Sequence, residues 1–122
     1  MKVYFDGGCR PAPSGMETAV VVRGRAYLQR DLGSGTSMDA EWLALIRAVE
    51  LARELELSNV LFLGDALSVI LPAIGASKCR GPSTHHLEKL KLVSESSVPL
   101  HIRHIRRTQN LAGIALARLH AR

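Results

Sequence analysis

A change of hydrophobic period along this chain restricts the folds that it can adopt. Over residues 39–57 apolar side chains recur every three or four positions with charged side chains between them, which predicts an amphipathic helix. Short strand-favouring runs lie on either side, at 2–5 and at 60–63. Two strands that are connected through a hairpin and a long helix can pair in parallel. The pattern therefore predicts an α/β fold in which the first and fourth strands are parallel neighbours.

The rest of the chain predicts a hairpin, three further helices and a last strand. The hairpin strands are expected at 18–22 and 26–29, the helices at 67–74, 84–93 and 110–120, and the last strand over 100–105. We interpret the glycine pair after residue 6 as the end of the first strand, because such pairs interrupt strands. The element order is β-β-β-α-β-α-α-β-α. A chain of 122 residues without a repeat or linker indicates a single domain over 1–122.

Composition limits the partners that the chain can have. A hydrophobic content of 47% is typical of a folded globular domain. The apolar runs fall far short of the ~20 residues that a membrane helix needs. The strand-like segment begins at residue 2, so we expect no signal peptide and no membrane partner. The formal net charge of +5 favours an anionic partner, with nucleic acid as the first candidate and no small-molecule cofactor.

The cysteines and the histidine pair do not form metal-ligand motifs. Cys9 and Cys79 lack the spacing of a metal site or a disulfide framework, which indicates a reducing compartment, and we expect a cytoplasmic protein. His85 and His86 are adjacent, and side chains of adjacent helical residues diverge by about 100°. The two imidazoles therefore cannot share one metal ion.

Three carboxylates are expected at one edge of the sheet. Asp6 and Asp65 follow the two parallel strands, and Glu41 lies in the first turn of the helix, beside its apolar face. Because the carboxyl ends of parallel strands meet at one edge, the three side chains converge there. Taken singly, they have structural explanations as a turn former, a helix N-cap and a helix-dipole partner. Together they would repel one another unless a hard divalent cation such as Mg²⁺ neutralised them.

Four motifs follow one another along the chain in a family-specific order. They are YFDGGCRPAP at 4–13, DAEWLAL at 39–45, LGDA at 63–66, and TQN at 108–110 ahead of ALAR at 115–118. In this order they resemble ribonuclease H type 1, over nearly the whole chain. The resemblance implies a ribonuclease H-like fold, with a five-stranded mixed sheet of three antiparallel and two parallel strands and helices on both faces. It also implies an endonuclease that cuts the RNA strand of RNA/DNA hybrids with two Mg²⁺ or Mn²⁺ ions.

The resemblance also implies which residues form the site. Asp6, Glu41 and Asp65 are then catalytic metal ligands, and two ions suit phosphodiester hydrolysis because one activates water and the other stabilises the leaving oxygen. The expected nucleic-acid-binding residues are Gly7, Gly8, Cys9 and Arg10 in the glycine-rich segment, Thr36 and Ser37 before the helix, and Arg106 and Arg107. The two arginines are expected to hold a backbone phosphate, and a solvated basic surface is their structural alternative.

The chain departs from the family pattern in its last helix. Aligning Asn110 and residues 116–117 with that pattern puts Ile114 at the position of the fourth catalytic aspartate. Isoleucine cannot ligate a metal ion, so we expect a weakened second metal site. Two replacements are open. Asn110 could supply its amide oxygen as a ligand, or could instead cap the last helix. His104 could approach from the last strand, or could be exposed or face a phosphate.

Further departures concern the substrate. Ala12 stands where the family pattern usually has an asparagine, and 36–38 lack the asparagines that are common before the glutamate, which leaves Thr36 and Ser37 as hydroxyl contacts. The only basic residues in the segment 72–82 are Lys78 and Arg80, so a long basic protrusion is not expected there. These differences leave open how strictly the protein prefers hybrids.

The expected function is that of a ribonuclease H with reduced or Mn²⁺-preferring activity on RNA/DNA hybrids. The alternative is a catalytically degenerate ribonuclease H-like domain that binds hybrid or double-stranded nucleic acid without cutting it. A related nuclease with another substrate, or a structural part of a larger enzyme, is a third interpretation.

Overall fold

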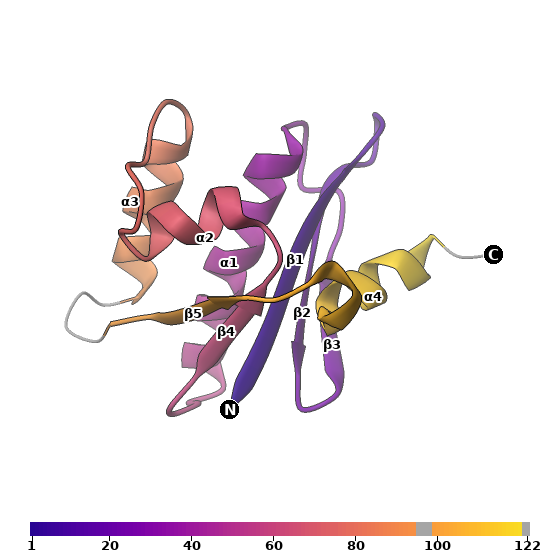
Figure 1. The fold of residues 1–122 in the computed structure, drawn as a ribbon. Helices are drawn as coiled ribbons and strands as arrows, with labels where there is room; N and C mark the ends of the chain where they lie inside the picture. Colours follow the sequence, from indigo (N-terminus) through magenta and orange to yellow (C-terminus); the bar gives the residue numbers. More distant parts are fainter. Residues whose placement is uncertain (95–98, 121–122) are drawn as a thin grey trace.

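The structure is a computed structural model, and it describes residues 1–94 and 99–120. Its centre is a five-stranded mixed sheet in the order β3-β2-β1-β4-β5 (Figure 1). The strands are β1 (Lys2–Arg10), β2 (Gly15–Val22), β3 (Arg25–Gln29), β4 (Leu61–Gly64) and β5 (His101–His104). β2 pairs antiparallel with β1 and β3, and β4 pairs in parallel with β1 and β5. The predicted mixed sheet with parallel first and fourth strands is confirmed.

Helices cover both faces of the sheet, as predicted. They are α1 (Ser37–Glu54), α2 (Leu67–Ala73), α3 (Ser83–Ser94) and α4 (Leu111–Leu119), with the short 3₁₀ helix η1 (Arg107–Gln109) before α4. The larger core lies on the α1 face and includes Trp42 and Leu45, both completely buried. The smaller core lies on the opposite face, where Ala112 and Leu116 of α4 pack on β2. The sheet is therefore the middle layer of three (Figure 1).

The first strand is longer than predicted. The glycine pair was expected to end it, but β1 continues to Arg10 and its pairing includes Gly7↔Thr18 and Gly8↔Glu17. The prediction was wrong because the first glycine serves a close approach of two elements. A Cβ atom on Gly7 would lie 2.1 Å from the carbonyl oxygen of Ala40, so only glycine lets β1 pass this close to α1. Asp6 consequently lies within a strand that pairs on its β2 side.

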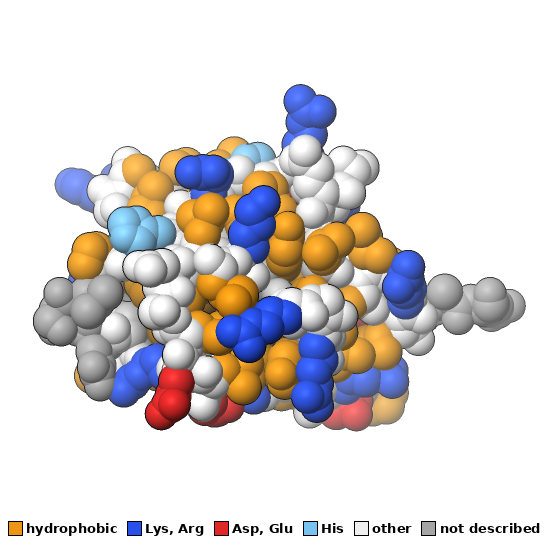
Figure 2. Space-filling view, turned by 90° about the horizontal axis from the view of Figure 1, so that it is seen from below, with side chains coloured by type: hydrophobic (Ala, Val, Ile, Leu, Met, Phe, Trp, Pro, Cys, Tyr) orange, Lys and Arg blue, Asp and Glu red, His pale blue; other side chains and the backbone are white. Residues whose placement is uncertain are grey.

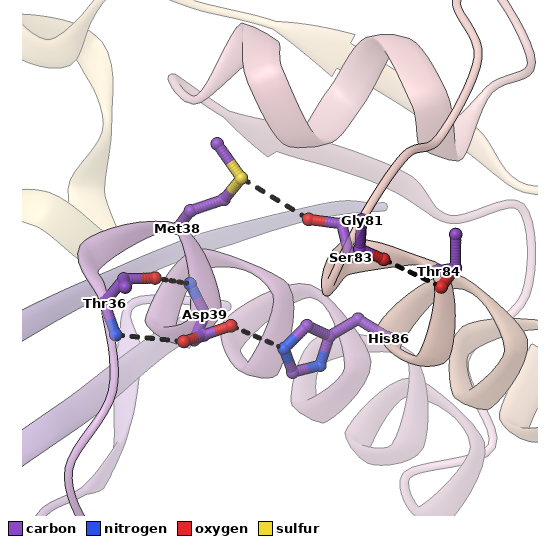
Figure 3. A network of polar contacts seen from close by, with 7 residues as sticks. All are labelled: Thr36, Met38, Asp39, Gly81, Ser83, Thr84 and His86. Carbon is purple, nitrogen blue, oxygen red and sulfur yellow. Dashed lines mark hydrogen bonds and ion pairs between the residues drawn. The ribbon is translucent and has the colours of Figure 1, made fainter.

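Helix α1 begins two residues earlier than the predicted start at 39, because the residue before it forms a capping box. The Thr36 hydroxyl accepts a hydrogen bond from the Asp39 backbone N–H, and the Asp39 carboxylate accepts one from the Thr36 N–H, both at 3.0 Å. His86 of α3 reaches the same carboxylate, with Nε2 2.9 Å from Oδ1 (Figure 3). These contacts hold the pKa of the Asp39 carboxyl below its ordinary value, with the Thr36 backbone N–H as the main cause. The start of α1 is thereby tied to α3, two residues before Glu41.

The described residues contain no candidate membrane-spanning helix, and one face of the molecule carries positively charged side chains. Within the described residues, no helix combines the length and the apolar character that crossing a membrane requires. The face seen from below the view of Figure 1 carries Lys and Arg side chains, spread between hydrophobic and uncharged ones (Figure 2). Positive charge is therefore not confined to the expected site.

Candidate active site

The carboxylates of Asp6, Glu41 and Asp65 come together, as the sequence predicts. The parallel pairing of β1 with β4 includes Tyr4↔Leu63; Asp6 lies two residues further along β1, and Asp65 directly follows the last residue of β4. Glu41 is on the first turns of α1, which passes close to β1. One carboxylate oxygen from each of the three residues can be chosen so that all lie within 4.8 Å of one another. The three residues are far apart in the sequence, on β1, on α1 and directly after β4, so only the tertiary fold brings their carboxylates together.

The cluster is electrostatically unfavourable without a cation. Burial is the main cause that raises the pKa of Glu41 from 4.5 to about 8, and the nearby Asp6 charge adds to it. Burial also raises the pKa of Asp6 to about 6, followed by the charge of Asp65, while Arg107 acts in the opposite direction. The three residues offer only oxygen ligands, which are the donors that Mg²⁺ and Mn²⁺ prefer. The donor set therefore fits a hard divalent cation.

Backbone and amide groups hold two of the carboxylates in place. The Gly7 N–H donates a short hydrogen bond, 2.5 Å, to Oε1 of Glu41. The completely buried Asn110 donates from Nδ2 to Oδ2 of Asp65 and to the Phe5 carbonyl, each at 3.0 Å. Its Oδ1 accepts from the Ala112 N–H at 3.1 Å and caps α4. This differs from the metal-ligand prediction for Asn110, because its oxygen is engaged in the cap and the group that faces Asp65 is a donor, which cannot ligate a cation.

A pocket of about 530 Å³ opens over Asp6 and Glu41. Gly113 closes one side of it, since a Cβ atom there would lie 3.4 Å from Oδ2 of Asp6. Ile114 also lines the pocket and is 38% exposed. Ile114, which the sequence analysis aligned with the fourth aspartate of the family pattern, thus faces the same pocket as Asp6 and Glu41 with an aliphatic side chain.

The pocket includes most of the expected nucleic-acid-binding residues. Its lining contains Gly7, Gly8, Cys9, Arg10, Ser37 and Arg107. The described lining does not contain Thr36, Arg106 or His104. The Thr36 hydroxyl is the cap of α1, and the Arg106 N–H donates to Oε1 of Gln109 at the start of η1. His104 is exposed on β5.

Comparison with known proteins places the chain in a family. The model of a family described as reverse transcriptase-like matches residues 6–120. The chain belongs to the reverse transcriptase-like family. No curated protein sequence matches it.

Solved structures similar to this reverse transcriptase-like chain include RNases H1. The enzyme from the halophilic archaeon Halobacterium salinarum is 24% identical with a TM-score of 0.77, over 94% of this chain and 92% of that one. An RNase H1 isolated from compost is 25% identical with a TM-score of 0.74, over 98% and 97%. A complex of that compost enzyme with an RNA/DNA hybrid is 23% identical with a TM-score of 0.71, over 98% and 99%. The ribonuclease H-like fold of this family member is thereby shown.

Two pocket residues were missed by the sequence analysis. Glu17 of β2 and His120, the residue after α4, both line the pocket and are hydrogen-bonded to each other. The one available signal was Glu17, a charged residue in a strand where every other side chain is uncharged. His120 carries no signal of its own, because its partner lies 103 residues away.

Proposed function

We propose that the protein is a metal-dependent endoribonuclease that hydrolyses the RNA strand of RNA/DNA hybrids. The observation that carries this proposal is the convergence of three carboxylates, from Asp6, Glu41 and Asp65, beside a pocket that Asp6 and Glu41 line in a ribonuclease H-like fold. The hybrid as substrate is supported by the compost RNase H1, whose fold this chain shares and which binds an RNA/DNA hybrid. The expected cytoplasmic location belongs to the same proposal, and its support is the pair of free cysteines, Cys9 and Cys79.

The protein residues would bind and orient the reactants. Asp6, Glu41 and Asp65 would hold Mg²⁺ or Mn²⁺, and the bound ions would supply activation of water and stabilisation of the leaving oxygen. The Gly7 N–H fixes Glu41, and the Asn110 amide fixes Asp65. The ligands are therefore oriented before an ion binds, which reduces the ordering that binding requires.

Cationic side chains in the pocket support a polyanionic substrate. Arg107 is close enough to Asp6 to oppose the rise of its pKa. Arg10 lines the same pocket, together with the backbone of Gly7 and Gly8 and the Ser37 side chain. A guanidinium beside the carboxylates is suited to hold a phosphate of the nucleic-acid backbone.

Position 114 supports reduced activity or a preference for Mn²⁺. Ile114 lines the pocket but has no ligand atom, so an ion that relied on a fourth carboxylate would be held weakly. Mn²⁺ binds such sites more strongly than Mg²⁺ and tolerates less regular geometry. The same residue favours the alternative function, a domain that binds hybrid or double-stranded nucleic acid and does not cut it.

A cleavage assay separates the two functions. Purified protein is incubated with an end-labelled RNA/DNA hybrid in Mg²⁺ or in Mn²⁺, beside the Asp6→Asn variant. We expect cleavage of the RNA strand, stronger in Mn²⁺, that is lost in Asp6→Asn. Binding without cleavage in either ion would support the binding domain, and cleavage that persists in Asp6→Asn would indicate a contaminating nuclease and contradict the proposal.

A further inference from the structure

The pocket contains a polar pair that the carboxylate cluster does not use. Glu17 is 4% exposed, and its Oε1 lies 2.5 Å from Nε2 of His120. Its Oε2 lies 3.7 Å from Nε of Arg30, which is half exposed. A carboxylate can only accept hydrogen bonds, so Nε2 of His120 carries the hydrogen of this contact. The other ring nitrogen, Nδ1, then remains for a second partner.

The pair lies along the same sheet face as Asp6. Side chains alternate along a strand, so Asp6, Gly8 and Arg10 share one face of β1. Gly8 pairs with Glu17, and Asp6 pairs with Ala19 two residues along β2. Gly8 has no side chain and an added Cβ atom would meet nothing within 4 Å, so the space beside Glu17 is open.

Helix α4 forms the opposite wall and connects the two ends of the pocket. Gly113 faces Asp6, and Leu116, Ala117 and His120 follow at helical spacing, all of them lining the pocket. His120 is seven positions after Gly113, which corresponds to about 10 Å along a helix at a rise of about 1.5 Å per residue. The pocket thus extends from the carboxylates to the imidazole.

Glu17 is not needed to hold the end of α4 against β2 by packing. Ala19 and Val21 lie on the same face of β2 as Glu17, and they pack on Ala112 and Leu116 of α4 without any charge. Burial of a carboxylate costs free energy unless it is paired, and an apolar side chain in the same row would hold α4 equally well. Glu17 is paired with both Arg30 and His120, and of these two partners His120 is the one that lines the pocket.

We propose that Glu17 positions His120 to bind a backbone phosphate of the nucleic acid, at a subsite next to the carboxylates. This proposal rests on the proposed function and adds a contact to it. A protonated imidazole held at Nε2 donates from Nδ1 to a phosphate oxygen, and Arg10 in the same lining contributes positive charge. Phosphates on one strand are about 3.4 Å apart along a duplex axis, so a span of about 10 Å along α4 is long enough for His120 to meet a phosphate other than the one at the carboxylates.

Binding measurements on variants of His120 test the subsite. Fluorescence anisotropy with a labelled RNA/DNA hybrid is recorded over a range of salt, at pH about 6, where an ordinary histidine is largely protonated. Ca²⁺ replaces Mg²⁺, and the integrity of the hybrid is checked on a gel. His120→Gln keeps a donor for Glu17 but cannot take a positive charge. We expect its Kd to rise several-fold and the slope of log K against log salt to fall by roughly one.

Two further variants separate binding from folding. His101→Gln changes an exposed histidine of β5 outside the pocket lining and should leave Kd and slope unchanged. Glu17→Gln keeps an acceptor for the imidazole but not its charge, and should weaken binding less than His120→Gln does. Thermal unfolding of each variant is measured in parallel.

The outcomes distinguish the subsite from the proposed function. If His120→Gln lowers the melting temperature but leaves Kd and salt slope as in the wild type, the pair only docks α4 and the subsite is refuted. If the wild-type protein binds the hybrid but does not cut it in Mg²⁺ or Mn²⁺, the proposed nuclease function is refuted. The subsite is then decided by the Kd and salt slope of the His120 variant alone. A wild-type protein that does not bind the hybrid overturns both.

Discussion

Asn110 joins the last helix to the carboxylate cluster, because its Nδ2 lies 3.0 Å from Oδ2 of Asp65 while its Oδ1 caps α4. One completely buried side chain therefore fixes the start of α4, the end of β4 and, through the Phe5 carbonyl, the middle of β1. Asp65 is held by a neutral donor, which orients its carboxylate for a cation. A helix cap is in this way part of the candidate metal site.

Asn110→Ala is expected to weaken both folding and metal binding. It removes a helix cap, worth about 1 kcal/mol, and leaves a buried carbonyl without its donor, worth about 1–3 kcal/mol. We expect the free energy of unfolding to fall by the sum, measured by urea denaturation, together with a weaker affinity for Mn²⁺. Thr36→Ala is the matched control, since it removes the cap of α1 at an exposed position and should cost about 1 kcal/mol alone. Equal losses in the two variants would contradict the wider role of Asn110.

Ile114→Asp should increase the cleavage activity in Mg²⁺. The residue lines the pocket beside Gly113, which lies against Asp6, and its partial exposure lets a polar side chain be accommodated. A fourth carboxylate should raise kcat/KM by about tenfold or more, which corresponds to about 1.4 kcal/mol of transition-state stabilisation. Ile114→Asn introduces a side chain of nearly the same shape as aspartate but without its charge, so it should raise kcat/KM much less than Ile114→Asp does. Absence of a gain would mean that α4 does not direct this side chain toward the ions.

The ratio of activities in Mn²⁺ and Mg²⁺ should change with the same substitution. In the wild type we expect Mn²⁺ to support faster cleavage, because an incomplete ligand set favours the ion that binds more strongly and with less strict geometry. In Ile114→Asp the ratio should approach one. Initial rates over a titration of each ion measure this directly. A wild-type rate in Mg²⁺ that equals or exceeds the rate in Mn²⁺ would refute the explanation.

The metal-free protein should lose stability as the pH rises. The pKa of Glu41 is about 8 in the folded state against its ordinary 4.5, so the folded state binds this proton more tightly than the unfolded state. The free energy of unfolding therefore falls between pH 4.5 and about 8. The lowered pKa of Asp39 acts only below its ordinary value of 3.8 and does not contribute in this range.

Glu41→Gln tests the assignment of that pH dependence. The amide keeps an acceptor for the Gly7 N–H but does not titrate, so urea denaturation in EDTA should show a much smaller loss between pH 5 and 8. A residual loss near pH 6 is expected from Asp6. Added Mn²⁺ should stabilise the wild type most at the high end of the range, where the carboxylates are deprotonated. Parallel profiles for the wild type and the variant would contradict the role of Glu41.

Some of the site could be predicted from the sequence because its signals are local. Asp6 and Asp65 come after the strand-favouring residues of two strands whose parallel pairing brings them to one edge of the sheet, and Glu41 lies near the start of a strongly periodic helix that packs on the first strand. The extension of β1 through Gly7 could not be predicted, since it depends on how closely α1 approaches. The contact between Glu17 and His120 joins residues with no shared motif at opposite ends of the chain. Asn110 was recognisable as a cap, but its second bond, to Asp65, depends on the packing of α4 against β1 and β2.

Arg107→Ala should weaken the binding of a hybrid and flatten its salt dependence. Arg107 is the first residue of η1, lines the pocket, and influences the pKa of Asp6, so it can reach a phosphate beside the carboxylates. Loss of one phosphate contact should reduce the slope of log K against log salt by about 0.9. Arg25→Ala is the control. Arg25 stacks on Tyr27 of β3 and lies outside the pocket lining, so this substitution removes the same charge at a different place. If both variants changed the slope equally, net charge rather than a specific contact would explain the binding, and the phosphate role of Arg107 would be refuted.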